Sequence, residues 1–413
     1  MSKVRNLLVL FTLGIYLAGQ GQGISQGPAP ITAITPDDDY SYWYGYYDKL
    51  LIDPTQRYVL SMRTKTENRT PGADDMVEVG MTDTKDNFKW IKLGESRAWG
   101  WQQGCMLQFI PGSAEEIIWN DRENDKYIAR IINIRTRKIR TLPKAIYTIS
   151  PNGKWALGLD FARLQTRRPG YGYTGVKDTT LNMKVPSNNG IYKIDLTSGQ
   201  SKMLITLEQI ASIPLEGYNA PDYYQWVNHL LINPAGNRFV FLHRWAKQPT
   251  DRFYTRMFTA DKDGKNLYIL DPSGFTSHFI WKDNKHVAIF TKPAGMKGRF
   301  YLFQDKTRNI SIIGENKMTV NGHQSYIGNT GKKWMVNDTY PNKERIQTLF
   351  LYHEATDERI DIGKFLAPPG FDGEWRCDLH PWSAGDGTKV FFQSAHEGKR
   401  RVYMVDINKL IKK

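Results

Sequence analysis

Short apolar runs alternate with turns rich in Gly, Asn, Asp and Lys along most of the chain after residue 36. One order recurs: a short strand, a turn, a second strand, a variable excursion, and a strand that ends near an aspartate. This order divides the chain into seven units, which begin near residues 46, 101, 145, 226, 278, 323 and 378. Alternating apolar residues between turn signals predict about four short antiparallel strands in each unit.

The spacing of these units indicates the architecture. Seven units over about 365 residues give about 52 residues each, and repeats of this length with four strands are typical of a β-propeller. We therefore predict an all-β fold, a seven-bladed β-propeller that forms a single domain over residues 37–413. The stretch 37–47 is a candidate closing strand. Six or eight blades stay as alternatives, because the boundaries at 160–190 and 205–225 are weak.

The first residues have the composition of an export signal. Lys3 and Arg5 precede an apolar stretch over 7–18 that is short for a membrane span. We predict a signal peptide over 1–22 and a flexible lead-in over 23–36. An exported protein, periplasmic or extracellular and without a later membrane span, is the expected product, and an uncleaved anchor is the alternative.

Net charge bears on the choice of partner, and the two cysteines bear on disulfide formation. Lys and Arg number 56 against 42 Asp and Glu, which gives a net charge of +14. For an exported protein this favours an acidic polysaccharide as the partner. No nucleic-acid-binding motif is present, and we expect a monomer. Cys105 and Cys377 allow either a disulfide or two buried free thiols.

Histidines supply the strongest indication of a site. All eight follow residue 228, and four stand at the same place in successive units: His229, His278, His323 and His380. The first strand of each propeller blade lines the central channel, so these side chains should converge. The same position in the first three units holds Tyr47/Asp48, Gln102/Gln103 and Tyr147/Thr148. The alternative is a ring of hydrogen-bonded channel residues.

Units four to seven resemble the oligogalacturonate lyases over about 185 residues, and more loosely the seven-bladed propeller lyases of ulvan-type and rhamnose–glucuronate polymers. The segments that carry the resemblance are HLLINPAGNRFVFLHRW, RMFTADKDGKNL, SHFIWKDNKHVAIF, GHQSYIGNTGKKWMV and DLHPWSAGDGTKVFFQSAHEGKRRVYMVDI. The resemblance implies that His243, in FLHRW, is a Brønsted base.

It also implies a metal ion held by His278 and His380. Where the family has His-Pro-His-Pro, this chain has Asp378-Leu379-His380-Pro381, and Trp375 stands at the family's glutamine position. Asp378 could still ligate Mn²⁺ or Ca²⁺. A metal-free site, in which Arg376 binds the substrate carboxylate, remains the alternative.

A uronate lyase removes the C5 proton and must neutralise the adjacent carboxylate. Arginine suits the second task because it pairs bidentately with carboxylates. The predicted catalytic residues are His243, His229, Arg244 and Tyr147. The predicted substrate-binding residues are Arg97, Trp101, Gln102, Gln103, Arg256, His323 and Arg376, and the predicted metal ligands are His278, Asp378 and His380. The basic, Gly- and Tyr-rich run 163–175 is either a binding-face insertion or a surface loop.

Two other function classes fit the pattern less well. A non-catalytic carbohydrate- or protein-binding propeller has the same fold, since fold alone does not determine activity. That class does not require a titratable ring. A glycoside hydrolase needs two carboxylates that flank the scissile bond, and the sequence fixes no such pair.

Overall fold

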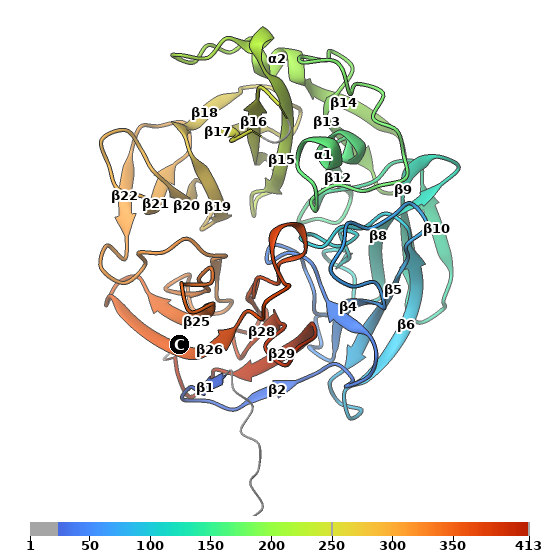
Figure 1. The fold of residues 1–413 in the computed structure, drawn as a ribbon, viewed down its shortest axis with the longest axis vertical. Coiled ribbons are helices and arrows are strands. Elements are labelled where there is room, and N and C mark those ends of the chain that lie inside the picture. Colours follow the sequence, from blue (N-terminus) through green and yellow to red (C-terminus); the bar gives the residue numbers. More distant parts are fainter. Residues whose placement is uncertain (1–23, 249–250, 412–413) are drawn as a thin grey trace, which may run out of the picture.

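The computed structural model describes residues 24–248 and 251–411, and it confirms the predicted seven-bladed β-propeller (Figure 1). Seven antiparallel sheets surround a central axis, and each is one blade with its first strand innermost. The hydrophobic core lies between adjacent sheets, as in the cluster shared by the strands of the third and fourth blades. The predicted signal peptide lies outside the described residues.

The first three blades contain twelve strands, which pair in chain order within each blade. Blade one contains β3 (Ser41–Trp43), β4 (Tyr58–Thr64), β5 (Val77–Asp83) and β6 (Lys89–Ser96). Blade two contains β7 (Gln108–Phe109), β8 (Glu116–Glu123), β9 (Lys126–Asn133) and β10 (Ile139–Leu142). Blade three contains β11 (Thr148–Ile149), β12 (Trp155–Gly158), β13 (Gly190–Asp195) and β14 (Ser201–Thr206).

The last four blades follow the same plan. Blade four contains β15 (Tyr224–Ile232), β16 (Arg238–Ala246), β17 (Tyr254–Asp261) and β18 (Tyr268–Gly274). Blade five contains β19 (Thr276–Trp281), β20 (His286–Thr291), β21 (Arg299–Gln304) and β22 (Ile310–Ile313). Blade six contains β23 (Ser325–Tyr326), β24 (Trp334–Asn337), β25 (Ile346–His353) and β26 (Glu358–Leu366). Blade seven contains β27 (Trp382–Ser383), β28 (Lys389–Ser394) and β29 (Arg401–Asp406).

The N-terminal segment closes the ring, so the prediction of a flexible lead-in over 23–36 is wrong. β1 (Ile24–Gln26) adds a fifth strand to blade six beside β26, and β2 (Ile31–Ala33) supplies the outer strand of blade seven beside β29 (Figure 1). The predicted closing strand at 37–47 instead contains β3, the inner strand of blade one. Pairing with a free strand edge satisfies backbone groups that would otherwise face solvent.

Two insertions explain the weak unit boundaries. Helix α1 (Phe161–Arg167) follows β12 and begins where the Asp160 side chain accepts from the N–H groups of Ala162 and Arg163. Helix α2 (Leu207–Ala211) follows β14, with a capping box between Thr206 and Gln209. The 3₁₀ helices η1 (Ala220–Asp222) and η2 (Gly373–Trp375) lie in loops.

The structure also bears on the pairing of the two cysteines and on membrane-spanning helices. Cys105 and Cys377 are both buried and free, so they form two thiols and no disulfide. Among the helices that the structure describes, none is long and apolar enough to cross a membrane.

Candidate active site

The structure brings the four in-register histidines together at one end of the channel. The ring centroids of His278 and His323 are 4.0 Å apart, and those of His323 and His380 are 4.3 Å apart. His229 and His380 have positive φ angles of 51° and 45°. Such backbone conformations are rare for residues other than glycine and are often found at functional sites.

Tyr46 occupies the middle of this histidine ring. It comes from the connection between β3 and β4, and its ring centroid lies 5.0 Å from that of His229 and 4.8 Å from that of His380. Its hydroxyl is buried and has no hydrogen-bond partner among the described residues. Blade one therefore fills the space that four histidines from the other half of the chain surround.

His323, Asp378 and His380 form a buried cluster whose ligand atoms lie within 4.8 Å of one another. The Nδ1 of His323 lies 3.0 Å from Asp338 Oδ2, and the Nδ1 of His380 lies 2.6 Å from the Gly45 carbonyl oxygen. Both Nε2 atoms are buried and have no hydrogen-bond partner in the described part of the chain. Imidazoles that ligate a metal are usually held through the other ring nitrogen in this way.

A pocket of about 460 Å³ opens beside the ring. Its walls come from the segment after α1, from β15, β16 and β19, and from the loops that carry Asn321 and Tyr340. The residues that give it chemical character are His229, His278, Arg167, Arg168, Arg244, Arg252, Tyr171 and Tyr340. Four arginines against one carboxylate, Asp251, make the pocket cationic, which suits an anionic ligand.

Arg244 is the most unusual group in this pocket. The residue is 5% exposed, and its Nε and Nη1 atoms are buried without a hydrogen-bond partner. Its guanidinium lies 4.9 Å from the centroid of the Phe253 ring. Burial, followed by the charge of Arg168, lowers the pKa of Arg244 to about 10, so the group is still a cation at neutral pH. A buried charge without a partner destabilises the folded protein unless a ligand of opposite charge pairs with it.

His229 is held by two buried polar residues. Its Nδ1 lies 3.0 Å from Gln103 Nε2 and 3.3 Å from the Tyr147 hydroxyl, which donates to Gln103 Oε1 at 2.9 Å. Nε2 is therefore the ring nitrogen left for a ligand in the pocket. Burial, with the nearby Arg244 cation, lowers the pKa of His229 well below its ordinary value, so the imidazole is neutral at neutral pH.

Tyr171 connects the pocket to the buried cluster. Its hydroxyl accepts from Arg376 Nη2 at 2.9 Å, and Arg376 Nε donates to Asp378 Oδ2 at 2.7 Å. The rings of Tyr171 and His229 are in edge contact, with centroids 5.6 Å apart. Burial alone would raise the pKa of Tyr171, but the Arg376 and Arg168 cations lower it below its ordinary value. The phenol is thus a better proton donor than a solvent-exposed tyrosine.

No protein-family model matches this sequence, and no curated protein matches it either. Solved structures do match. One is an oligogalacturonate lyase in complex with manganese, with a TM-score of 0.67 and 14% identity over 93% of this chain and 95% of that chain. Another is the oligogalacturonate lyase of Vibrio parahaemolyticus, with a TM-score of 0.65 and 12% identity over 94% and 97% of the two chains. The chain has the fold of the oligogalacturonate lyases.

The oligogalacturonate lyase resemblance, first seen in units four to seven, thus extends to the fold of nearly the whole chain. Within this fold, however, the structure does not bring His243 to the pocket. His243 is fully buried, with Nε2 2.8 Å from Gln225 Oε1 and Nδ1 3.0 Å from Arg256 Nε. Side chains alternate along β16, so Arg244 faces the pocket and His243 faces the opposite side. His243 therefore lies outside the lining of this pocket, and its base role stays a prediction.

Arg256 also lies outside the lining of this pocket. It belongs to the His243 side of blade four, where Nη1 and Nη2 donate to the carbonyl oxygens of Ile213 and Ile210, both at 2.9 Å. These contacts hold the segment after α2 against β17. Arg256 is fully buried, and its substrate-binding role stays a prediction.

The residues predicted from the Trp-Gln-Gln segment also lie beneath the surface. Trp101 packs against Trp43, with centroids 5.3 Å apart, and is 1% exposed. Gln102 donates to the carbonyl oxygens of Glu374 and Arg376 and so fixes the loop that carries Arg376. Gln103 and Tyr147 position His229 and do not face the pocket directly, while Arg97 lies in a separate hollow.

The buried cluster differs in one member from the predicted metal ligands His278, Asp378 and His380. His278 lines the pocket, with its Nδ1 3.0 Å from Asn321 Oδ1 and its Nε2 3.4 Å from the Tyr340 hydroxyl. His323, predicted to bind substrate, takes its place beside Asp378 and His380.

Sequence reasoning missed several residues of the site, among them Tyr46, Arg168, Tyr171, Asp338 and Tyr340. Arg168 and Tyr171 lie in the run 163–175, whose composition did mark it as a candidate binding-face insertion. Tyr46 lies next to Tyr47 at the expected channel position. Asp338 comes from the end of β24, and no sequence pattern distinguishes it from other turn aspartates. Burial raises the pKa of Asp338 to about 6.

Proposed function

We propose that the protein is a polysaccharide lyase that cleaves uronate-containing acidic saccharides by β-elimination in this pocket. The observation that carries the proposal is Arg244, whose buried Nε and Nη1 have no hydrogen-bond partner among the described residues and which lines the same pocket as His229 and Tyr171. A uronate supplies the carboxylate that would complete Arg244. It also supplies the weakly acidic C5 proton on which His229 could act.

Arg244 is proposed to neutralise the carboxylate at C5. A guanidinium can donate two parallel hydrogen bonds to a carboxylate, and the contact is stronger where water is excluded. Negative charge grows on that carboxylate as the C5 proton leaves. A fixed, buried cation therefore stabilises the transition state more than the ground state.

His229 and Tyr171 are proposed to move the protons. With the Gln103 amide turned so that its Oε1 accepts from Nδ1–H, neutral His229 carries its proton on Nδ1. The Nε2 lone pair then takes the C5 proton, the electron pair forms the C4–C5 double bond, and the C4–O bond breaks. The Tyr171 hydroxyl donates its proton to the departing oxygen. Gln103 and Tyr147 hold the ring of His229 in place through Nδ1. His229 needs no deprotonation beforehand because its depressed pKa keeps it neutral.

A divalent cation fits the cluster of His323, Asp378 and His380. Two imidazoles with one carboxylate favour a transition metal such as Mn²⁺ over Ca²⁺, which prefers oxygen ligands throughout. The similar structure in complex with manganese is consistent with this choice. Such an ion would supply positive charge for binding anionic groups of the substrate. Asp338 and the Gly45 carbonyl orient the two imidazoles.

Ultraviolet absorbance tests the reaction type. The protein is incubated separately with polygalacturonate, ulvan and rhamnose–glucuronate polymers, and with short oligosaccharides of each. We expect at least one series to yield a product with the C4–C5 unsaturated chromophore. Saturated reducing ends without this chromophore would show hydrolysis, and no cleavage of any uronate would favour a binding propeller; either result rejects the proposal.

A further inference from the structure

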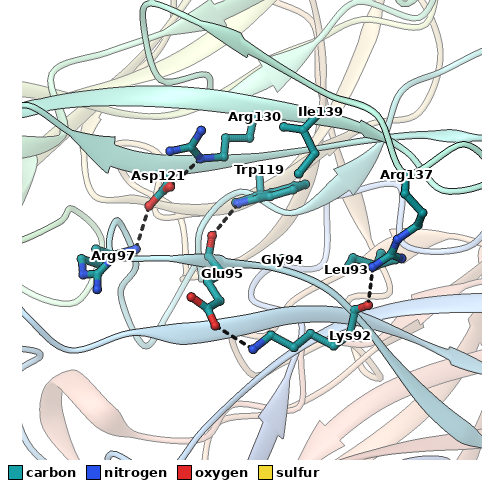
Figure 2. Close-up of a pocket in the computed structure, with 10 residues that line it drawn as sticks. All are labelled: Lys92, Leu93, Gly94, Glu95, Arg97, Trp119, Asp121, Arg130, Arg137 and Ile139. Carbon is teal, nitrogen blue, oxygen red and sulfur yellow. Dashed lines mark hydrogen bonds and ion pairs between the residues drawn. The ribbon is translucent and has the colours of Figure 1, made fainter.

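A second hollow lies on the rim of the propeller, between blades one and two. It has a volume of about 580 Å³ and lies between β6 on one side and β8, β9 and β10 on the other (Figure 2). Its lining shares no residue with that of the histidine pocket. The charged residues of this rim groove are Lys92, Arg97, Arg130, Arg137, Glu95 and Asp121.

Two of the four cations in the groove lining are in ion pairs. Lys92 pairs with Glu95 at 2.6 Å, and Arg130 pairs with Asp121 at 2.6 Å (Figure 2). Lys92 also pairs with Glu78 at 2.8 Å, and Arg130 with Glu123 at 3.3 Å. The side chains of Arg97 and Arg137 make no ion pair among the described residues, although the Arg97 backbone N–H donates to Asp121 Oδ1 at 2.9 Å. Arg137 Nη2 donates to the Lys92 carbonyl oxygen at 2.9 Å, which places its guanidinium beside that end of β6.

The two uncompensated arginines lie at opposite ends of the groove. Arg97 is five residues beyond Lys92 along the edge strand, a separation of roughly 16 Å at about 3.3 Å per residue. Between them Leu93 and Ile139, the latter 50% exposed, give the wall an apolar part. A ligand that fits has anionic groups spaced along its length and less polar faces between them.

We propose that the rim groove is a non-catalytic binding site for a segment of acidic, carboxylate-bearing polysaccharide. Arg97 and Arg137 contact two carboxylates of the chain, and sugar faces lie against Ile139. The site retains the polymer at the protein surface, and its binding does not depend on elimination in the histidine pocket.

Affinity electrophoresis in native gels that contain polygalacturonate tests the groove. All variants carry Arg244→Gln, so that the polymer stays intact during the run. We expect this background protein to be retarded by polygalacturonate and not by a neutral glucan. Adding Arg97→Gln and Arg137→Gln should weaken the apparent affinity about tenfold, because two charge contacts are lost, and should reduce its dependence on salt.

A matched control removes two other exposed cations of the same background, by Arg308→Gln and Lys343→Gln on blades five and six. This pair should change the affinity much less than the groove pair, although the net charge is equal. Equal effects of the two pairs would show attraction by net charge alone and overturn the proposal. Absence of retardation in the Arg244→Gln background would also overturn it, and neither result concerns the reaction in the histidine pocket.

Discussion

The histidines of the site serve two adjoining places, the cationic pocket and the buried cluster beside Asp378. His229 presents Nε2 to the cationic pocket, while His323 and His380 present theirs to a buried space beside Asp378. Asp338, Gly45, Gln103 and Tyr147 fix the three rings through their Nδ1 atoms. Each imidazole therefore has one nitrogen committed to the protein and one available for chemistry.

Substitution of one histidine at a time should show which histidines bind the metal and which only line the pocket. We predict that His323→Ala weakens Mn²⁺ binding by more than about a hundredfold, because loss of even a supporting partner costs about 10–100-fold. His278→Ala, a change in the same ring, should leave binding within a few-fold of wild type. Calorimetric titration of chelator-treated protein with Mn²⁺ measures both.

Loss of Mn²⁺ binding in His278→Ala with retention in His323→Ala would instead support the ligand set predicted from sequence. No binding by the wild-type protein would show that the cluster is metal-free and that Arg376 alone neutralises Asp378.

The sequence was informative about histidine register and less so about side-chain direction. The four channel histidines were predictable because the repeat fixes where each inner strand begins. His243 and Arg244 are adjacent in β16, and a displacement of one residue along a strand reverses the face. The resemblance pointed to β16, and in this strand Arg244, not His243, lines the pocket. Tyr171 lies in an irregular insertion, where no periodicity predicts direction.

At the scale of elements, the ring is closed by very short strands. β2 pairs with β29 through Ile31–Ala33, opposite Val405, Met404 and Tyr403. The N–H of Ile34 donates to the Val402 carbonyl oxygen at 2.9 Å. Alternate residues of an antiparallel pair share this direction, so the Thr32 N–H faces β29 and the Ala33 N–H faces away.

Proline substitutions should distinguish these two positions. We predict that Thr32→Pro destabilises the protein by about 3 kcal/mol, because it removes a ladder hydrogen bond and introduces a clash. Ala33→Pro should cost much less, since proline is tolerated where the N–H of an edge strand faces solvent. Thermal unfolding of both variants provides the comparison. Equal melting temperatures for the two would contradict closure by β2.

These closing strands could not be predicted from local pattern. The segment 24–33 reads ISQGPAPITA, and its Gly, Pro and small residues are typical of a linker. Three-residue strands show almost no alternation, and their pairing with β26 and β29 depends on residues more than 330 positions away. The blades were predictable because each contains its own strands and turns, whereas closure is a property of the whole ring.

At the scale of the molecule, the two halves of the chain contribute different parts of one site. The second half supplies the histidines, Arg244 and Asp378, while blade one supplies Tyr46 and the insertion of blade three supplies Arg168 and Tyr171. The repeat period predicted the seven-bladed ring and hence the convergence of the histidines. It did not predict which inserted loops cover the pocket, because insertions do not follow the repeat.

The most direct test of the central claim compares wild-type protein with Arg244→Gln on the best uronate substrate. The rate of formation of the unsaturated product is followed by ultraviolet absorbance, with folding verified by circular dichroism. The account predicts that Arg244→Gln lowers kcat by about 100–1000-fold, as expected for loss of a group that stabilises transition-state charge. A folded Arg244→Gln protein with wild-type kcat would show that the carboxylate is neutralised elsewhere and would contradict the account.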